Sequence, residues 1–200
     1  MPDQRVVPPI TTLAGLFALL TLATADVAAQ IFRADSLRQV QSVVPRSGPP
    51  GTQISISSVN LPLEARVHIA VGTLFAGFET VGEAAQGELG EISASVHIPT
   101  GATWDRPLYV IALNGVFMPI GISDPFHVTD ANGMIRRVGR VTDEGWPCLT
   151  LRDENDLLYS LTGELGTFRP GDQVVVDGTY ARASSCRDGS TIGVTRIEAR

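Results

Sequence analysis

Short segments in which apolar and polar residues alternate recur along most of this chain, separated by turns rich in glycine and proline. The segment 91–98 is the clearest, because Ile92, Ala94, Val96 and Ile98 would share one face and the polar residues between them the other. A period of two is typical of a strand buried on one side. Glycine and proline make up 20 and 13 of the 200 residues, which favours many short strands over long helices. The sequence therefore predicts an all-β fold.

The alternating segments fall into two groups, which predict two domains separated by a polar turn at 129–133. The group in 42–129 suits an immunoglobulin-like β-sandwich, because such sandwiches consist of short strands joined by frequent turns. The group in 134–200 has five candidate strands and suits a small OB-like β-barrel. The expected strands are 53–57, 66–71, 91–98, 108–113 and 126–128 in the first domain, and 134–142, 147–152, 157–161, 172–181 and 191–198 in the second.

Residues 1–29 have the features of a secretory signal peptide. Residues 10–22 form an apolar run of 13 residues, shorter than the roughly 20 needed for a transmembrane helix but suited to a signal-peptide core. Small residues before Gln30 provide a cleavage site, and a second candidate precedes Asp26. We therefore expect a periplasmic or secreted protein with no membrane span after cleavage; an uncleaved membrane anchor is the alternative. Residues 30–41 are expected to be a linker or a short helical turn.

The two cysteines of the chain, Cys148 and Cys186, both lie in the second predicted domain. An even number of cysteines in an exported protein indicates a disulfide. A domain of about 70 residues buries a small share of its surface, so a covalent link would add useful stability. Two free thiols are the alternative. A zinc site is disfavoured because neither a C-x-x-C pair nor a nearby histidine completes a set of four ligands.

Two stretches resemble known groups of domains. Residues 47–52 leading into 54–56, then 67–72 and 94–99, resemble the IPT/TIG branch of immunoglobulin-like domains over about 42–129. This resemblance implies a spacer or binding module and carries over no catalytic residues.

The second domain, over 134–200, resembles an uncharacterised group of small exported bacterial domains. The residues that carry this resemblance are 139–145, 159–163, 168–172 and 192–197, together with the two cysteines. The resemblance implies a disulfide-linked β-barrel and no particular reaction.

The motifs of the common catalytic and cofactor-binding sites are missing from the sequence. G-x-S-x-G, H-E-x-x-H, the phosphate-binding G-x-x-x-x-G-K-[ST] and the dinucleotide-binding G-x-G-x-x-G do not occur. Of the three histidines, His68 and His97 are expected to be solvated on the polar faces of their strands. His127 is expected at a strand edge or at the domain interface. We therefore predict no catalytic residues and no cofactor.

The acidic turn 153–156 is the best candidate for a metal site, because Asp153, Asn155 and Asp156 could offer oxygen ligands to calcium. Aspartate and asparagine also cap hairpin turns by accepting hydrogen bonds from nearby backbone N–H groups. The hairpin turn is the favoured interpretation, and no metal is predicted.

Arg136, Arg137 and Arg140 form the densest basic cluster, and they are expected to lie on a solvated strand face. The net charge of −6 argues against a nucleic-acid partner. Trp104 and Trp146 are expected to cover a loop or to lie in the core or at its rim, and either could instead be an exposed anchor for a partner.

The sequence thus predicts a non-enzymatic, exported bacterial binding or adaptor protein of the periplasm or cell envelope. Its partner would be an unknown envelope protein or a small ligand. The alternative is a barrel that binds a small molecule or cation and acts as an envelope sensor. An enzyme with an unrecognised site is a third hypothesis.

Overall fold

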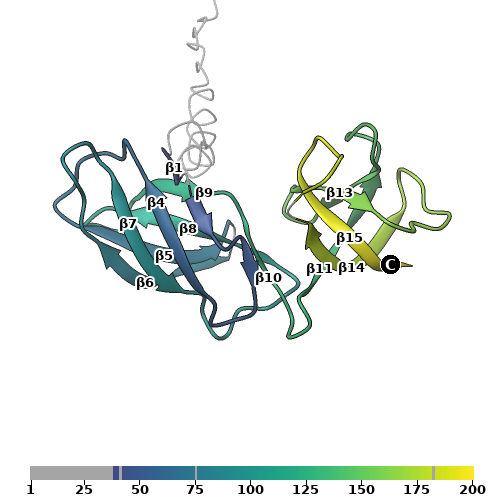
Figure 1. Ribbon diagram of the computed structural model, residues 1–200, viewed down its shortest axis with the longest axis horizontal. Coiled ribbons are helices and arrows are strands. Elements are labelled where there is room, and N and C mark those ends of the chain that lie inside the picture. Colours follow the sequence, from purple (N-terminus) through teal and green to yellow (C-terminus); the bar gives the residue numbers. More distant parts are fainter. Residues whose placement is uncertain (1–37, 41, 75, 182) are drawn as a thin grey trace, which may run out of the picture. The chain divides into compact units, whose positions relative to one another are not determined.

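The computed structural model describes residues 38–40, 42–74, 76–181 and 183–200, and the regular elements of this part of the chain are all β-strands (Figure 1). The prediction of an all-β sandwich followed by a small barrel is confirmed. The predicted signal peptide and most of the predicted linker lie outside the described residues. Within these residues, no helix has the length and apolar character that crossing a bilayer requires.

Strands β1 to β10 form the sandwich. One sheet has three antiparallel strands in the order β2-β4-β7. The other has seven strands, in which β8 pairs with β5, β9 and β10, β5 pairs with the edge strand β6, and β1 and β3 run parallel to β9 and β10. The bounds are β1 (Arg38–Val40), β2 (Ser42–Val44), β3 (Ser47–Gly48), β4 (Gln53–Ser58), β5 (Val67–Thr73), β6 (Gly77–Ala84), β7 (Ile92–His97), β8 (Pro107–Leu113), β9 (Pro119–Ser123) and β10 (Phe126–Val128). This arrangement is compatible with an immunoglobulin-like domain.

The two sheets enclose one apolar core. Ile54 and Ile56 of β4 alternate with exposed residues and point toward Val110 and Ala112 of β8 in the same cluster. Because strand side chains alternate between faces, the remaining residues of β8 point to the opposite face of the seven-stranded sheet. There Tyr109, Ile111 and Leu113 form a second buried cluster with Ala70, and Leu157, which lies beyond the sandwich strands, packs against it.

Strands β11 to β15 form the closed barrel β11-β12-β13-β15-β14, with β13 and β15 parallel and the other pairs antiparallel. This order is compatible with an OB-like domain. A core of buried aliphatic residues and Tyr159 fills it. The bounds are β11 (Met134–Thr142), β12 (Thr150–Asp153), β13 (Leu158–Thr162), β14 (Gln173–Ala181) and β15 (Ser190–Ala199).

Several parts of the sandwich differ from the sequence expectation. The predicted linker 30–41 contributes a strand, since Arg38–Val40 pairs in parallel with β9. Strands β2, β3, β6 and β9 are not among the expected strands, and β2 and β3 are only three and two residues long. Strand β6 lies at a sheet edge and is mostly exposed, so it lacks the apolar alternation that marks a half-buried strand. Strand β9 is short and contains both proline and glycine.

Candidate functional site

A cluster of buried polar side chains lies where the sandwich meets the barrel. His127 of β10 and Arg137 of β11 are each only 1% exposed. The imidazole ring stacks on Tyr180 of β14 with 4.6 Å between ring centroids, and it meets the ring of Tyr159 of β13 edge-on. Its Nε2 lies 3.1 Å from the hydroxyl oxygen of Ser190 at the start of β15. Four barrel strands therefore contact this one histidine of the sandwich.

The guanidinium of Arg137 is held by neutral acceptors. Its Nε donates to the Tyr159 hydroxyl at 3.0 Å, and Nη1 donates to the backbone carbonyls of Trp104 and Arg136 at 3.0 and 2.6 Å. Its Nη2 lies 3.2 Å from Nδ1 of His127. A buried cation is tolerated only when its donors are satisfied, so this set of acceptors explains how Arg137 can lie inside the protein.

The contact with Arg137 determines the tautomer of His127. An arginine side chain can only donate hydrogen bonds, so Nδ1 must accept, and the ring proton lies on Nε2. The Nε2–H group then donates to Ser190. Burial, together with the positive charges of Arg137 and Arg46, lowers the pKa of His127 to about 3, so the ring is neutral at ordinary pH.

Further polar contacts surround this cluster. The hydroxyl of Tyr159 also interacts with the Asp153 carboxylate. The pKa of Tyr159 rises to about 12, mainly because the side chain is buried. Arg46, just before β3, donates to Tyr180 and pairs with Asp124 at 2.8 Å. The hydroxyl of Tyr109 is the one buried side-chain polar atom in the described part of the chain that lacks a hydrogen-bond partner.

The pair of Ser190 and His127 has the wrong polarity for nucleophilic catalysis. In a Ser–His catalytic pair, the ring nitrogen that faces the hydroxyl must accept its proton, and a carboxylate holds the other nitrogen. Here Nε2 already carries the proton, and a guanidinium occupies the position of the carboxylate. The arrangement joins the two parts of the protein, and it does not activate Ser190.

The basic cluster of the sequence separates into different environments. The prediction of a solvated face is wrong for Arg137, which lies in the interior. Arg136 forms two hydrogen bonds of 2.7 Å with the buried carboxylate of Asp177, and its guanidinium stacks over the Trp104 ring at 4.5 Å from the centroid. Arg140 is exposed. The cluster therefore does not present one basic surface.

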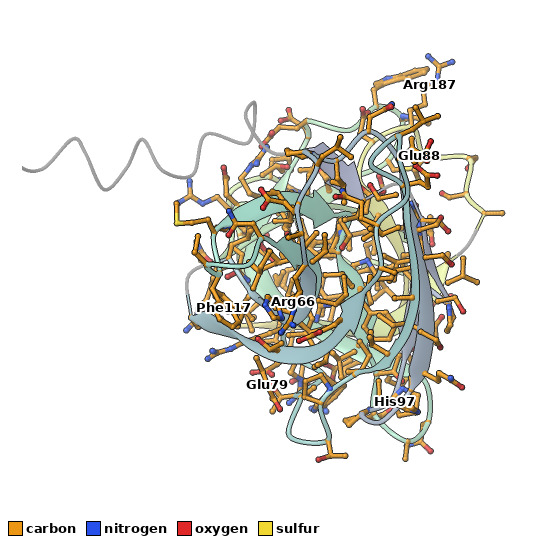
Figure 2. All side chains as sticks on the ribbon, turned by 90° about the vertical axis from the view of Figure 1, so that its left-hand side faces the viewer. Arg66, Glu79, Glu88, His97, Phe117 and Arg187 are labelled. Carbon is orange, nitrogen blue, oxygen red and sulfur yellow. A yellow bond between two sulfur atoms is a disulfide. The ribbon has the colours of Figure 1, made fainter. Side chains whose placement is uncertain are left out.

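The two other histidines differ from each other. His97 is exposed, and Figure 2 labels it on β7 of the three-stranded sheet. The prediction of a solvated side chain is wrong for His68, which is 8% exposed. Phe117 stacks on its ring at 4.5 Å between centroids, and Glu83 lies 3.3 Å from its Nδ1. His68 points to the second face of the sheet, and other parts of the protein cover that face as well. A strand pattern alone does not reveal this covering.

The acidic turn 153–156 connects β12 and β13, and its oxygens contact protein donors. Asp153 Oδ1 accepts the backbone N–H groups of Asn155 and Leu157, both at 2.8 Å. Asp156 pairs with Arg152 at 2.9 Å. Within the described residues, no group of three or more His, Cys, Asp or Glu side chains is placed to hold a metal ion.

A disulfide joins Cys148 and Cys186, with 5.7 Å between their Cα atoms. It links the loop between β11 and β12 to the loop between β14 and β15. Trp146, in the first of these loops, is 77% exposed, whereas Trp104 is half-buried.

An exposed apolar hairpin at 114–118 was not found by sequence reasoning. Val116, Phe117 and Met118, between β8 and β9, are 75%, 50% and 50% exposed. The side-chain oxygen of Asn114 accepts the backbone N–H groups of Val116 and Met118 at 3.1 and 2.9 Å. Phe117 has a φ of 61°, a conformation that costs a bulky residue energy. The signal that could have revealed it is three consecutive apolar residues immediately after the turn-forming pair Asn-Gly.

An open groove of about 420 Å³ lies at one end of the sandwich, between the β5–β6 turn and the loop 99–102.

Comparisons with protein-family models and with curated proteins find no match for this chain.

Proposed function

We propose that this chain is a non-enzymatic, exported bacterial binding or adaptor protein of the periplasm or cell envelope, and that its partner is a protein. The hairpin 114–118 carries this proposal. Three consecutive apolar side chains are 50% or more exposed there, whereas the other exposed large hydrophobic residues, such as Leu63 and Leu89, stand singly in the sequence. Exposed apolar groups that lie together commonly mark a surface that another molecule covers.

The hairpin is held in shape before any partner arrives. Asn114 fixes the backbone on both sides of Phe117, and the stacking of Phe117 on His68 fixes its ring. Side chains that are already ordered lose little conformational freedom on binding, which favours affinity. The unfavourable backbone conformation of Phe117 supports the same view, because such strain tends to persist at functional sites.

The charge of the chain favours a protein partner over a membrane surface. The net charge is −6, and the hairpin 114–118 contains no charged residue. Anionic lipid surfaces attract basic segments and repel acidic proteins. An uncharged apolar tip on an acidic protein is better suited to an apolar pocket of another protein, where buried aromatic anchors supply much of the binding energy.

Site-specific photocrosslinking in an envelope extract tests this proposal. A photoreactive residue in place of Val116 should give one dominant adduct. The same residue in place of Leu63, which is 69% exposed in a different loop, should not give that adduct. The substitution Phe117→Asn should abolish the adduct at position 116. Equal adducts at both positions, or an adduct unaffected by Phe117→Asn, would show that the hairpin is not the recognition surface.

The sensor alternative predicts a different result with the same protein. A calcium-dependent or small-molecule-dependent rise in the melting temperature, in the absence of any adduct at position 116, would favour a ligand-binding barrel. Mutation of Asp153 would then test whether the acidic turn is involved.

A further inference from the structure

The contact between the sandwich and the barrel depends on an imidazole that is surrounded by donors and cations. His127 accepts a hydrogen bond from Arg137 and donates one to Ser190. The two charged groups that act most strongly on its ring, Arg137 and Arg46, are both positive. The imidazole can hold the barrel only while the imidazole is neutral, because only the neutral ring has a free lone pair at Nδ1.

Protonation of His127 would turn its contact with Arg137 from attraction into repulsion. An imidazolium has N–H groups at both nitrogens, so Nδ1–H would face the Nη2–H of Arg137 across 3.2 Å. Arg137 would lose one of its acceptors, and two positive charges would lie together in the interior. Interior charges interact more strongly than charges in water and cannot be hydrated there.

The elements packed around His127 offer little compensation for the added charge. Arg137 comes from β11, Tyr159 and Tyr180 from β13 and β14, and Ser190 from β15. Both tyrosines present rings to the imidazole.

Two carboxylates that contact neighbours of His127 are occupied by other groups. Asp153 interacts with the hydroxyl of Tyr159 and caps its own turn, and Asp124 pairs with Arg46.

A second observation concerns the free energy needed to separate the two surfaces. It is smaller than it would be if every buried polar group at the contact had a hydrogen-bond partner. Tyr109, on the face of β8 against which Leu157 packs, has a buried hydroxyl with no hydrogen-bond partner among the described residues. A buried polar group without a partner is unfavourable relative to its hydrated state. Separation of the two surfaces would hydrate this hydroxyl, which offsets part of the lost apolar contact.

We propose that the contact between the sandwich and the barrel is an acid-sensitive joint, which opens when His127 takes up a proton and closes again when that proton leaves. Each part keeps its own strands, since the two parts have separate cores. The exposed ring in the open form has an ordinary pKa of 6.5, whereas the pKa is lowered in the closed form. The ratio of closed to open form is therefore independent of this group above pH 6.5, and between pH 6.5 and about pH 3 each pH unit of acidification shifts the ratio about tenfold toward the open form.

Trp104 provides a reporter for the joint. It lies in the loop between β7 and β8, its ring contacts Arg136, and its carbonyl accepts from Arg137. Replacing the exposed Trp146 by phenylalanine leaves Trp104 as the one tryptophan of the chain. In this W146F protein, acidification from pH 7 to pH 4 should shift the Trp104 emission reversibly, while far-UV circular dichroism stays unchanged.

The substitution His127→Gln removes the titrating group but keeps a donor and an acceptor, so the emission shift should be lost. His97→Gln makes the same chemical change at an exposed site and should leave the shift intact. If His127→Gln fails to fold, hydrogen exchange of the W146F protein provides the test. The backbone N–H of Arg136 donates to the carbonyl of Trp104 at 3.2 Å across the joint, and it should lose protection at acid pH before the strands of the two cores do. The proposal is overturned if the Trp104 emission and the protection of this N–H change only when the whole protein unfolds, or if His127→Gln shows the same shift.

Discussion

The joint and the hairpin 114–118 reverse the usual distribution of residues in opposite ways. The joint buries Arg137 and His127, which are polar, and the hairpin exposes Val116 and Phe117, which are apolar. In the joint, Arg137 and His127 have hydrogen-bond partners on other strands, so their burial is explained by contacts inside the protein. In the hairpin, the ring of Phe117 stacks on His68, whereas the side chains of Val116 and Met118 remain 75% and 50% exposed. The comparison separates a region that holds the chain together from a region that is available to a partner.

The largest effect is expected from Arg137→Ala. This change removes the donor to the Tyr159 hydroxyl and one of the two donors to the carbonyl of Trp104, and it creates a cavity between the sandwich and the barrel. We expect the free energy of unfolding to fall by about 3–5 kcal/mol. Arg140→Ala, on the same strand but exposed, should change it by less than about 0.5 kcal/mol. Urea denaturation of both variants measures the difference, and equal effects would mean that Arg137 is not a buried anchor.

Removal of the disulfide is expected to have the next largest effect. Cys148 and Cys186 are 38 residues apart, and closure of such a loop restricts the unfolded chain by about 4 kcal/mol at most. The double variant Cys148→Ser with Cys186→Ser should lose about 2–4 kcal/mol, with the barrel affected first. Hydrogen exchange of the backbone amides in β14 and β15 measures the stability of the barrel directly. A loss confined to the sandwich strands would contradict this assignment.

A change of one pH unit is expected to alter the free energy of unfolding by less than either of these substitutions. The pKa of His127 is lowered in the folded protein to about 3 from an ordinary value of 6.5. The unfolded chain therefore binds a proton below pH 6.5 that the closed form does not, and the stability of the closed form decreases as the pH falls from 6.5 toward 3. The slope from this group is about 1.4 kcal/mol per pH unit. The slope should be reduced by that amount in His127→Gln, as measured by chemical denaturation at several pH values.

The smallest effect on stability is expected from Phe117→Asn. Asparagine tolerates a positive φ better than phenylalanine does, which offsets the lost stacking on His68. We expect the free energy of unfolding to change by less than about 1 kcal/mol while partner capture is lost. A large loss of stability with intact capture would reverse the roles that we assign to the joint and the hairpin.

Much of the fold could be predicted because its strands follow period-two patterns. Phe126–Val128 and Met134–Thr142 coincide with their predicted ranges. The pattern also contained an unused signal for Arg137, which shares a strand face with Ile135 and Val141 and is buried with them. Arginine is rarely buried unless its donors are satisfied, so its residue type favours a solvated side chain although the pattern places it on the apolar face.

Other features could not be read from local sequence. His68 lies opposite the apolar residues of β5, as predicted, but the second face of that sheet is also covered. The partners of His127 come from strands that follow it by up to 63 residues. Such contacts depend on how the sandwich and the barrel pack, and a strand pattern contains no information about that packing.

The protonation state of His127 tests the central claim most directly. Long-range nitrogen–proton NMR correlations assign the ring protons of each histidine as the pH is changed. We predict that His127 is neutral at pH 6, with its proton on Nε2 and with Nδ1 as the acceptor. A proton on Nδ1, or a charged ring at pH 6, would contradict the contact with Arg137 that joins the barrel to the sandwich.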